Sequence, residues 1–120
     1  MRIKIREADR LFSLYLRKKR KYICERCGRF YPEGNGLQAS HYFGRAAESV
    51  RFDEDNVDVL CFTDHQFFTA NPNEYREWKV KKLGPEELKK LTIRWNTYKK
   101  KDDALIILFL KKKKKEPSEE

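Results

Sequence analysis

Three cysteines and one aspartate have the types and spacing of metal ligands. Cys24 and Cys27 form a Cys-x-x-Cys turn, and Cys61 is followed three residues later by Asp64. A tight turn can direct two thiolates at one point, as tetrahedral zinc requires, and a carboxylate is an accepted though less common zinc ligand. We therefore predict a structural Zn²⁺ site, a zinc knuckle, at these four residues.

The fourth ligand of this zinc knuckle has more than one interpretation. Asp64 can supply a carboxylate oxygen, but His65 follows at once and can supply an imidazole nitrogen. In that case Asp64 would only add negative charge to a helix N-terminus. A redox dithiol is another interpretation of the Cys-x-x-Cys turn, and it is disfavoured because no βαβ pattern surrounds the turn.

The chain has two histidines, and an asparagine lies between them. His41, Asn56 and His65 are spaced His-x14-Asn-x8-His. This spacing resembles that of the HNH endonucleases, whose ββα-metal finger places the first His on one strand, the Asn on the next and the last His on a helix. The stretches "SHYFGR" and "RFDEDNVDVLC" are similar to the phage NinG-type recombination nucleases, a resemblance that is firm over residues 24–84.

The resemblance implies a role for each of these side chains. His41 would be the general base, since a neutral imidazole can take a proton from an attacking water. Asn56 would hydrogen-bond the backbone across the loop and hold His41 in place. His65 would bind one catalytic divalent metal, Mg²⁺ or Mn²⁺, which stabilises charge on the scissile phosphate. On this interpretation Asp64 serves the zinc knuckle and His65 points the other way.

The chain departs from the family at the residue before the general base. Family members often have Asp or His there as a second metal ligand, whereas this chain has Ser40. A hydroxyl is a poor ligand, so the predicted catalytic metal site is weak and favours Mn²⁺, which tolerates imidazole better than Mg²⁺ does. Thr69, one helical turn beyond His65, is also a weak ligand.

Positive charge favours a nucleic-acid partner. The formal net charge is +9, with 28 Lys and Arg gathered in blocks. Arg45 and Arg51 lie in the loop between His41 and Asn56, where they could grip phosphate or pair with the acidic residues nearby. The first basic block, also predicted to bind DNA, comprises Arg17, Lys18, Lys19, Arg20 and Lys21.

Hydrophobic periodicity and turn residues predict one α+β domain that positions these groups. A ββα-metal finger with the zinc knuckle (core 22–84) is flanked by an N-terminal helix and two or three C-terminal helices within residues 1–115. Thr63 and Gln66 read as a capping box that starts the finger's helix at Asp64. The expected elements are helix 5–19, strands 37–43 and 56–61, helices within 72–112, and a disordered acidic tail, 116–120.

Cysteine usage and apolar runs indicate where the protein works. Three cysteines cannot all pair as disulfides, and the charged N-terminus lacks the apolar region of a signal peptide. The longest apolar run, 104–110, is far shorter than the ~18 residues needed to cross a bilayer. We expect the cytoplasm of a bacterial or phage-infected cell, and no membrane partner.

The leading hypothesis is a metal-dependent DNA endonuclease that hydrolyses phosphodiester bonds in duplex or branched DNA. Branched recombination intermediates follow if the resemblance extends to the substrate. A homodimer would suit cleavage of both strands of a symmetric junction. Two alternatives remain open: a non-catalytic, zinc-stabilised nucleic-acid-binding module, which Ser40 and Asp64 favour, and a nicking or packaging-associated HNH nuclease.

Overall fold

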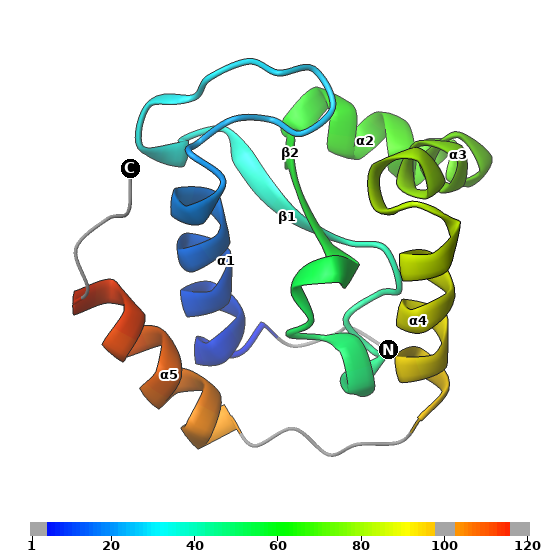
Figure 1. The fold of residues 1–120 in the computed structure, drawn as a ribbon. Coiled ribbons are helices and arrows are strands. Elements are labelled where there is room, and N and C mark those ends of the chain that lie inside the picture. Colours follow the sequence, from blue (N-terminus) through cyan, green and yellow to red (C-terminus); the bar gives the residue numbers. More distant parts are fainter. Residues whose placement is uncertain (1–4, 98–102, 116–120) are drawn as a thin grey trace.

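A short β-hairpin lies at the centre of the protein (Figure 1). The computed structural model describes residues 5–97 and 103–115. Strands β1 (Leu37–His41) and β2 (Val57–Cys61) pair antiparallel, with Leu37 opposite Cys61 and His41 opposite Val57. Both predicted strands form, but the first ends two residues earlier than predicted and the second begins one residue later. β1 ends at His41, because beyond Tyr42 the backbone bonds the Asn56 side chain.

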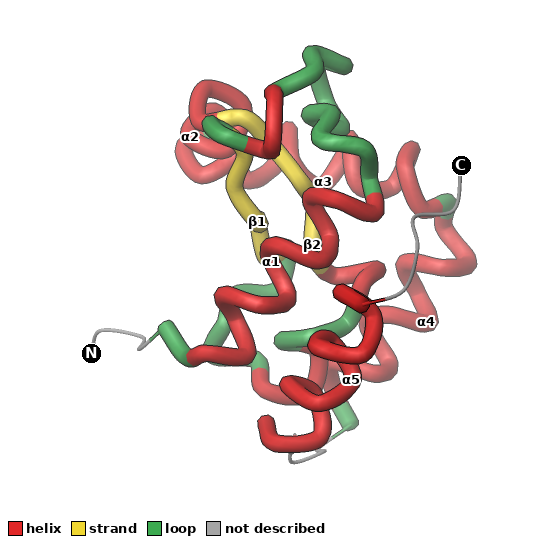
Figure 2. The backbone as a smooth tube through the Cα atoms, turned by 90° about the vertical axis from the view of Figure 1, so that its left-hand side faces the viewer, coloured by secondary structure: helices red, strands yellow, loops and turns green. Residues whose placement is uncertain are grey.

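Helices surround this hairpin, and the predicted α+β class is confirmed. The described residues form five α-helices and one two-stranded sheet: α1 (Glu7–Lys19), α2 (Phe62–Ala70), α3 (Pro72–Leu83), α4 (Pro85–Asn96) and α5 (Asp103–Lys115). Single 3₁₀ turns span Pro32–Gly34, Glu48–Val50 and Glu54–Asn56. Helix α5 lies alongside α1, and α2 follows β2 directly, which completes a ββα unit (Figures 1 and 2).

Local sequence signals set most of the helix boundaries. Asn71 is the N-cap residue of α3, without a side-chain capping hydrogen bond, and Pro72 is its first residue. Gly84 ends α3 with a φ of 85°, a conformation that favours glycine, and Pro85 opens α4. The predicted tail at 116–120 and the segment 98–102 before α5 lie outside the described residues.

The predicted start of α2 is wrong by two residues. The capping box expected from Thr63 and Gln66 does not form, because α2 begins at Phe62 with Cys61 as its extended N-cap residue. The helix therefore starts as soon as the strand ends. Asp64 and His65 still lie in the first turn of α2, where the sequence placed them.

Strand β2 is buried on both faces, although its sequence predicts alternating burial. Asp58 is fully buried on the side of α3. Tyr75 Oη donates to its Oδ2 at 2.6 Å, and Lys79 Nζ donates to its Oδ1 at 2.8 Å. A buried carboxylate is tolerated when it is paired and hydrogen-bonded in this way. These bonds fasten the hairpin to α3.

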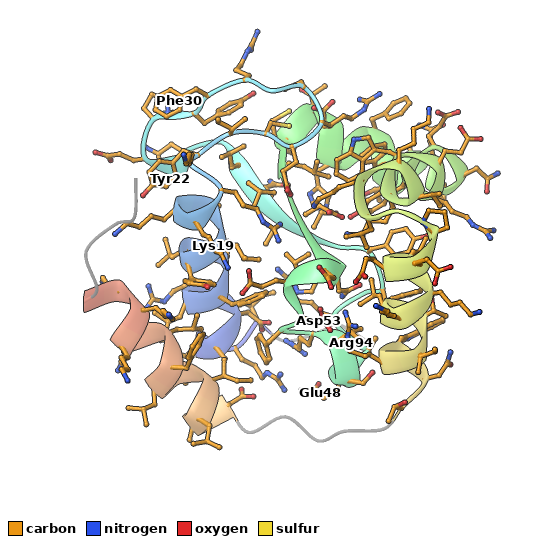
Figure 3. All side chains as sticks on the ribbon, in the orientation of Figure 1. Lys19, Tyr22, Phe30, Glu48, Asp53 and Arg94 are labelled. Atoms are coloured by element: carbon orange, nitrogen blue, oxygen red, sulfur yellow. The ribbon has the colours of Figure 1, made fainter. Side chains whose placement is uncertain are left out.

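Helix α4 closes over the loop that joins the two strands. Arg94 Nε lies 2.7 Å from Asp53 Oδ2 in this loop (Figure 3). Ser49 Oγ donates to the carbonyl of Trp95 at 2.8 Å, and the Trp95 ring stacks on Phe43 with 4.0 Å between centroids. The loop between His41 and Asn56 is thereby held in place by α4.

No helix in the described part of the chain is long and apolar enough to cross a membrane.

Candidate active site and metal cluster

The four predicted knuckle residues come together in space. The ligand atoms of Cys24, Cys27, Cys61 and Asp64 all lie within 4.8 Å of one another. Cys24 and Cys61 are buried and Cys27 is exposed. Three sulfurs and one carboxylate oxygen are a donor set that suits tetrahedral zinc. The prediction that this cluster could hold a structural metal such as zinc is confirmed.

Hydrogen bonds close the Cys-x-x-Cys turn and hold it against strand β2. Gly28 N donates to the Cys24 carbonyl at 2.9 Å, which closes the turn. Glu25 docks the turn on the hairpin: its backbone N donates to Val59 O at 2.9 Å, and its carboxylate accepts from Val59 N at 2.6 Å. Cys24 is thus brought beside Cys61, whose backbone N lies 3.3 Å from Cys24 Sγ.

Asp64, and not His65, faces the sulfurs. The Cys24 and Cys61 thiols donate to Asp64 Oδ2 at 3.2 and 3.3 Å. Burial raises the pKa of the Cys24 thiol to about 12. A bound metal would reverse this shift, because coordinating thiols are deprotonated. The adjacent His65 points away from the sulfurs, toward β1.

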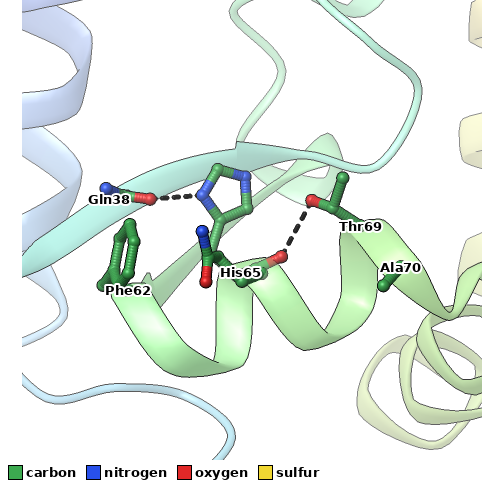
Figure 4. A pocket seen from close by; sticks show the side chains of 6 residues that line it. Gln38, Phe62, His65, Thr69 and Ala70 are labelled. Carbon is green, nitrogen blue, oxygen red and sulfur yellow. Dashed lines mark hydrogen bonds between the residues drawn. The ribbon is translucent and has the colours of Figure 1, made fainter.

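His65 lies in a pocket between α2 and the hairpin, lined by Gln38, Phe62 and Thr69 among others (Figure 4). Its Nδ1 contacts Oε1 of Gln38. An amide oxygen only accepts hydrogen bonds, so Nδ1 carries the proton and Nε2 keeps the lone pair that a metal needs. Burial, and then the charge of Arg45, lower the pKa of His65 and favour this neutral form. The Thr69 hydroxyl donates to the His65 carbonyl at 2.8 Å.

His41 is held by a backbone carbonyl at the end of β1. Its Nε2 lies 3.0 Å from Arg51 O. A carbonyl cannot donate, so Nε2 carries the proton and Nδ1 holds the lone pair. Burial, with the charge of Arg45 as the next cause, lowers the pKa of His41 to about 4. The ring is therefore neutral near pH 7, the form in which a histidine can accept a proton.

Asn56 is buried and ties both ends of the loop that follows His41. Its Oδ1 accepts from Phe43 N at 2.8 Å, and its Nδ2 donates to the carbonyls of Phe43 at 2.9 Å and Val50 at 3.1 Å. An amide offers one acceptor and two donors, and all are used here. The backbone on either side of the loop is fixed as a result.

Ser40 lies beneath helix α3. Its side chain is buried, and its hydroxyl is 3.0 Å from Tyr75 Oη. Tyr75 in turn donates to Asp58. The hydroxyl that was predicted as a weak metal ligand is therefore part of the buried network that fastens the hairpin to α3.

The two loop arginines have different surroundings. Arg51 is buried, and its Nε and Nη2 donate to the two carboxylate oxygens of Asp9 at 2.9 and 2.5 Å. The side chain of Arg45 is 31% exposed, and its Nε lies 3.9 Å from Asp9. The positive charge of Arg45 lowers the pKa of both His41 and His65.

The predicted basic block is divided between protein contacts and solvent. Arg17 donates to Gly34 O at 3.4 Å, Lys19 Nζ lies 2.8 Å from Glu54, and Arg20 Nη2 donates to Glu54 O at 2.8 Å. The remaining two residues, Lys18 and Lys21, are exposed.

Three residues near the site could not be found from the sequence motifs. Gln38 contacts His65, Asp9 holds Arg51, and Arg26 lies 2.7 Å from Asp64. Gln38 alone carries a sequence signal. It shares a strand face with Ser40, since alternate strand residues point the same way, and it is polar.

Comparison with known proteins gives one family. Residues 2–117 match the family described as bacteriophage lambda NinG protein. No curated protein and no solved structure matches the chain. The family match covers nearly all of the 120 residues. The chain therefore belongs to the NinG family of phage proteins.

Proposed function

We propose that this protein is a metal-dependent DNA endonuclease of the HNH type, with His41 as its general base. The observation that carries the proposal is the loop closed by Asn56, whose amide makes three hydrogen bonds to the backbone of Phe43 and Val50. This loop also supplies the Arg51 carbonyl that orients His41. Asn56 therefore positions the base without needing to touch a substrate.

In this mechanism the proton moves from water to His41. Nδ1 accepts the proton as the water oxygen attacks phosphorus and the bond to the 3′ oxygen breaks; the leaving 3′ oxygen takes a proton from solvent, and a 5′ phosphate is left. His65, with its proton on Nδ1, would hold a divalent cation such as Mg²⁺ or Mn²⁺ through Nε2. When bound, that cation would supply charge neutralisation at the scissile phosphate and the leaving oxygen.

Phosphate contact is assigned first to Arg45. Its side chain is partly exposed, its charge lowers the pKa of both histidines, and a guanidinium can bind phosphate through two donors. Exposed Lys18 and Lys21 would add contacts to the DNA backbone, which carry no sequence information. Duplex or branched DNA, including recombination intermediates, is the proposed partner, and a homodimer would let both strands of a junction be cut.

Ser40 favours a second candidate function, a non-catalytic, zinc-stabilised DNA-binding module. The Ser40 hydroxyl is hydrogen-bonded to Tyr75 in the buried network, so it does not serve as a metal ligand. The proposed catalytic metal site then has one strong ligand, His65. A single imidazole binds Mg²⁺ poorly. In that case the protein would bind DNA tightly without cutting it.

A cleavage assay separates the two candidates. Labelled duplex, single-stranded, forked and four-way DNA are incubated with Mg²⁺, Mn²⁺ or EDTA at low salt, with wild type, His41→Ala and the exposed control Glu77→Ala. Metal-dependent cutting that falls about 100-fold or more in His41→Ala, and not in the control, supports the nuclease. Binding without cutting under every metal supports the DNA-binding module.

A further inference from the structure

Asp64 has two carboxylate oxygens, and they have different partners. Oδ2 accepts from the Cys24 and Cys61 thiols, inside the metal cluster. Oδ1 lies 2.7 Å from Nη1 of Arg26. Asp64 is nearly buried, with a side chain 8% exposed, so this arginine is in direct contact with a carboxylate that has little solvent around it.

Arg26 is itself held in place by two aromatic side chains of helix α2. Its guanidinium carbon lies 4.4 Å from the ring centroid of Phe67 and 5.0 Å from that of Phe68. Cation–π contacts of this kind fix a planar guanidinium over an aromatic face. Arg26 lies between Cys24 and Cys27 in the Cys-x-x-Cys turn, and these ring contacts give its guanidinium a defined orientation toward Asp64.

We propose that Arg26 is the positioning residue that makes Asp64 the fourth ligand of the zinc knuckle. A carboxylate can rotate and offer either oxygen, and the bond to Oδ1 leaves Oδ2 directed at the metal position. Three thiolates and a carboxylate also outweigh the charge of one Zn²⁺, and Arg26 offsets part of the excess. Partners of this kind orient metal ligands and tune their affinity.

This role accounts for the residue type at position 64. A cysteine in this position would need no partner, because a thiolate offers one sulfur. An aspartate needs one oxygen held, and the turn that supplies two of the sulfurs also supplies the arginine. Since His65 is the next residue on α2, the same contact also fixes the turn from which His65 reaches its pocket.

Zinc affinity is the test, measured by competition with a chromophoric chelator, with the visible absorption of the Co²⁺-substituted protein as a second readout. We expect Arg26→Ala to weaken zinc binding about 10- to 100-fold. Arg26→Lys keeps the positive charge but loses the planar guanidinium that stacks on the phenylalanine rings. Its zinc affinity should lie between those of wild type and Arg26→Ala. The control Arg10→Ala removes an exposed arginine of helix α1 that pairs with Glu7, and it should bind zinc like wild type.

A double-mutant cycle shows whether Arg26 acts through Asp64. In the Asp64→Cys background, Arg26→Ala should cost no more than a few-fold in zinc affinity, because no carboxylate is left to orient. An equal loss in both backgrounds would overturn the proposal, as would unchanged affinity in Arg26→Ala or a wild-type chain that binds neither Zn²⁺ nor Co²⁺. If Arg26→Ala does not fold, the same cycle is run with Arg26→Lys. None of these readouts depends on nuclease activity.

Discussion

Asp9 and Arg51 form a buried ion pair with two hydrogen bonds, 2.9 and 2.5 Å long, between helix α1 and the loop that joins the strands. Burial alone would raise the pKa of Asp9, but the hydrogen bonds from Arg51 and Arg6 and the nearby positive charges lower it. The Arg51 carbonyl is the group that His41 Nε2 contacts. Helix α1 is thereby linked to the proposed general base through a single residue.

Breaking this pair should cost more stability than breaking an exposed one. Asp9→Ala removes the carboxylate that accepts two hydrogen bonds from the buried Arg51 guanidinium and leaves Glu48, 3.6 Å away, as a more distant partner, so we expect the free energy of unfolding to fall by about 3 to 5 kcal/mol. Glu7→Ala is the matched control, because it removes an exposed partner of Arg10 on the same helix and should cost at most about 1 kcal/mol. Urea unfolding measures both. Equal losses would mean that the buried pair contributes nothing special.

The contact between Gln38 and His65 predicts a defined imidazole tautomer. With Gln38 Oε1 as acceptor, neutral His65 carries its proton on Nδ1. The chain has two histidines, so ¹⁵N NMR of the imidazoles can assign the tautomer of each at a pH where both are neutral. We expect Gln38→Leu to shift His65 toward a mixture of tautomers. The control Gln66→Leu changes a second glutamine of the same pocket, and it should leave the tautomer unchanged.

A Gln38→Leu protein whose His65 keeps the proton on Nδ1 would contradict this assignment. The same spectra also report on His41, whose Nε2 should carry the proton in both proteins because it faces the Arg51 carbonyl. A change at His41 would show that the substitution disturbs the hairpin as a whole.

Boundaries set by local chemistry could be predicted from the sequence. Asn71 with Pro72, and Gly84 with Pro85, fix the ends of α3 and the start of α4 through backbone preferences that need no tertiary contact. The start of α2 could not be predicted, because Cys61 is at once the last strand residue and the helix N-cap residue.

The ligand cluster could be predicted because its spacing is that of a known metal geometry, whereas the long-range partners of Asp64, His65 and Arg51 could not. The partners of Gln38, Arg26 and Asp9 lie 27, 38 and 42 residues away in the chain. Polar residues that act through such contacts look like ordinary surface residues in a sequence. Burial of β2 on both faces could not be predicted either. It depends on hydrogen bonds from Tyr75 and Lys79 of α3 to the Asp58 carboxylate.

We expect that neither alanine nor aspartate at position 56 keeps the stability of the wild-type protein. Asn56→Ala leaves Phe43 N without its acceptor, and we expect a loss of about 1 to 3 kcal/mol in the free energy of unfolding. Asn56→Asp keeps that acceptor but turns an oxygen toward the carbonyls of Phe43 and Val50, so it should be at least as destabilising as alanine near pH 7. Thermal unfolding compares them. Wild-type stability in Asn56→Asp would contradict the hydrogen-bond assignment.

The pKa of His41 predicts a loss of stability in acid with a defined window. The folded-state pKa is about 4, below the ordinary value of 6.5, so between these values the unfolded state binds more protons than the folded state. Stability from this residue is therefore complete above pH 6.5 and falls as pH drops toward 4, by up to about 3 kcal/mol. We expect His41→Gln to flatten the dependence of unfolding free energy on pH between about pH 7 and about pH 5. If the unfolding free energy of His41→Gln depends on pH as steeply as that of wild type, the group with the lowered pKa is not His41. His65 is then the next residue to substitute.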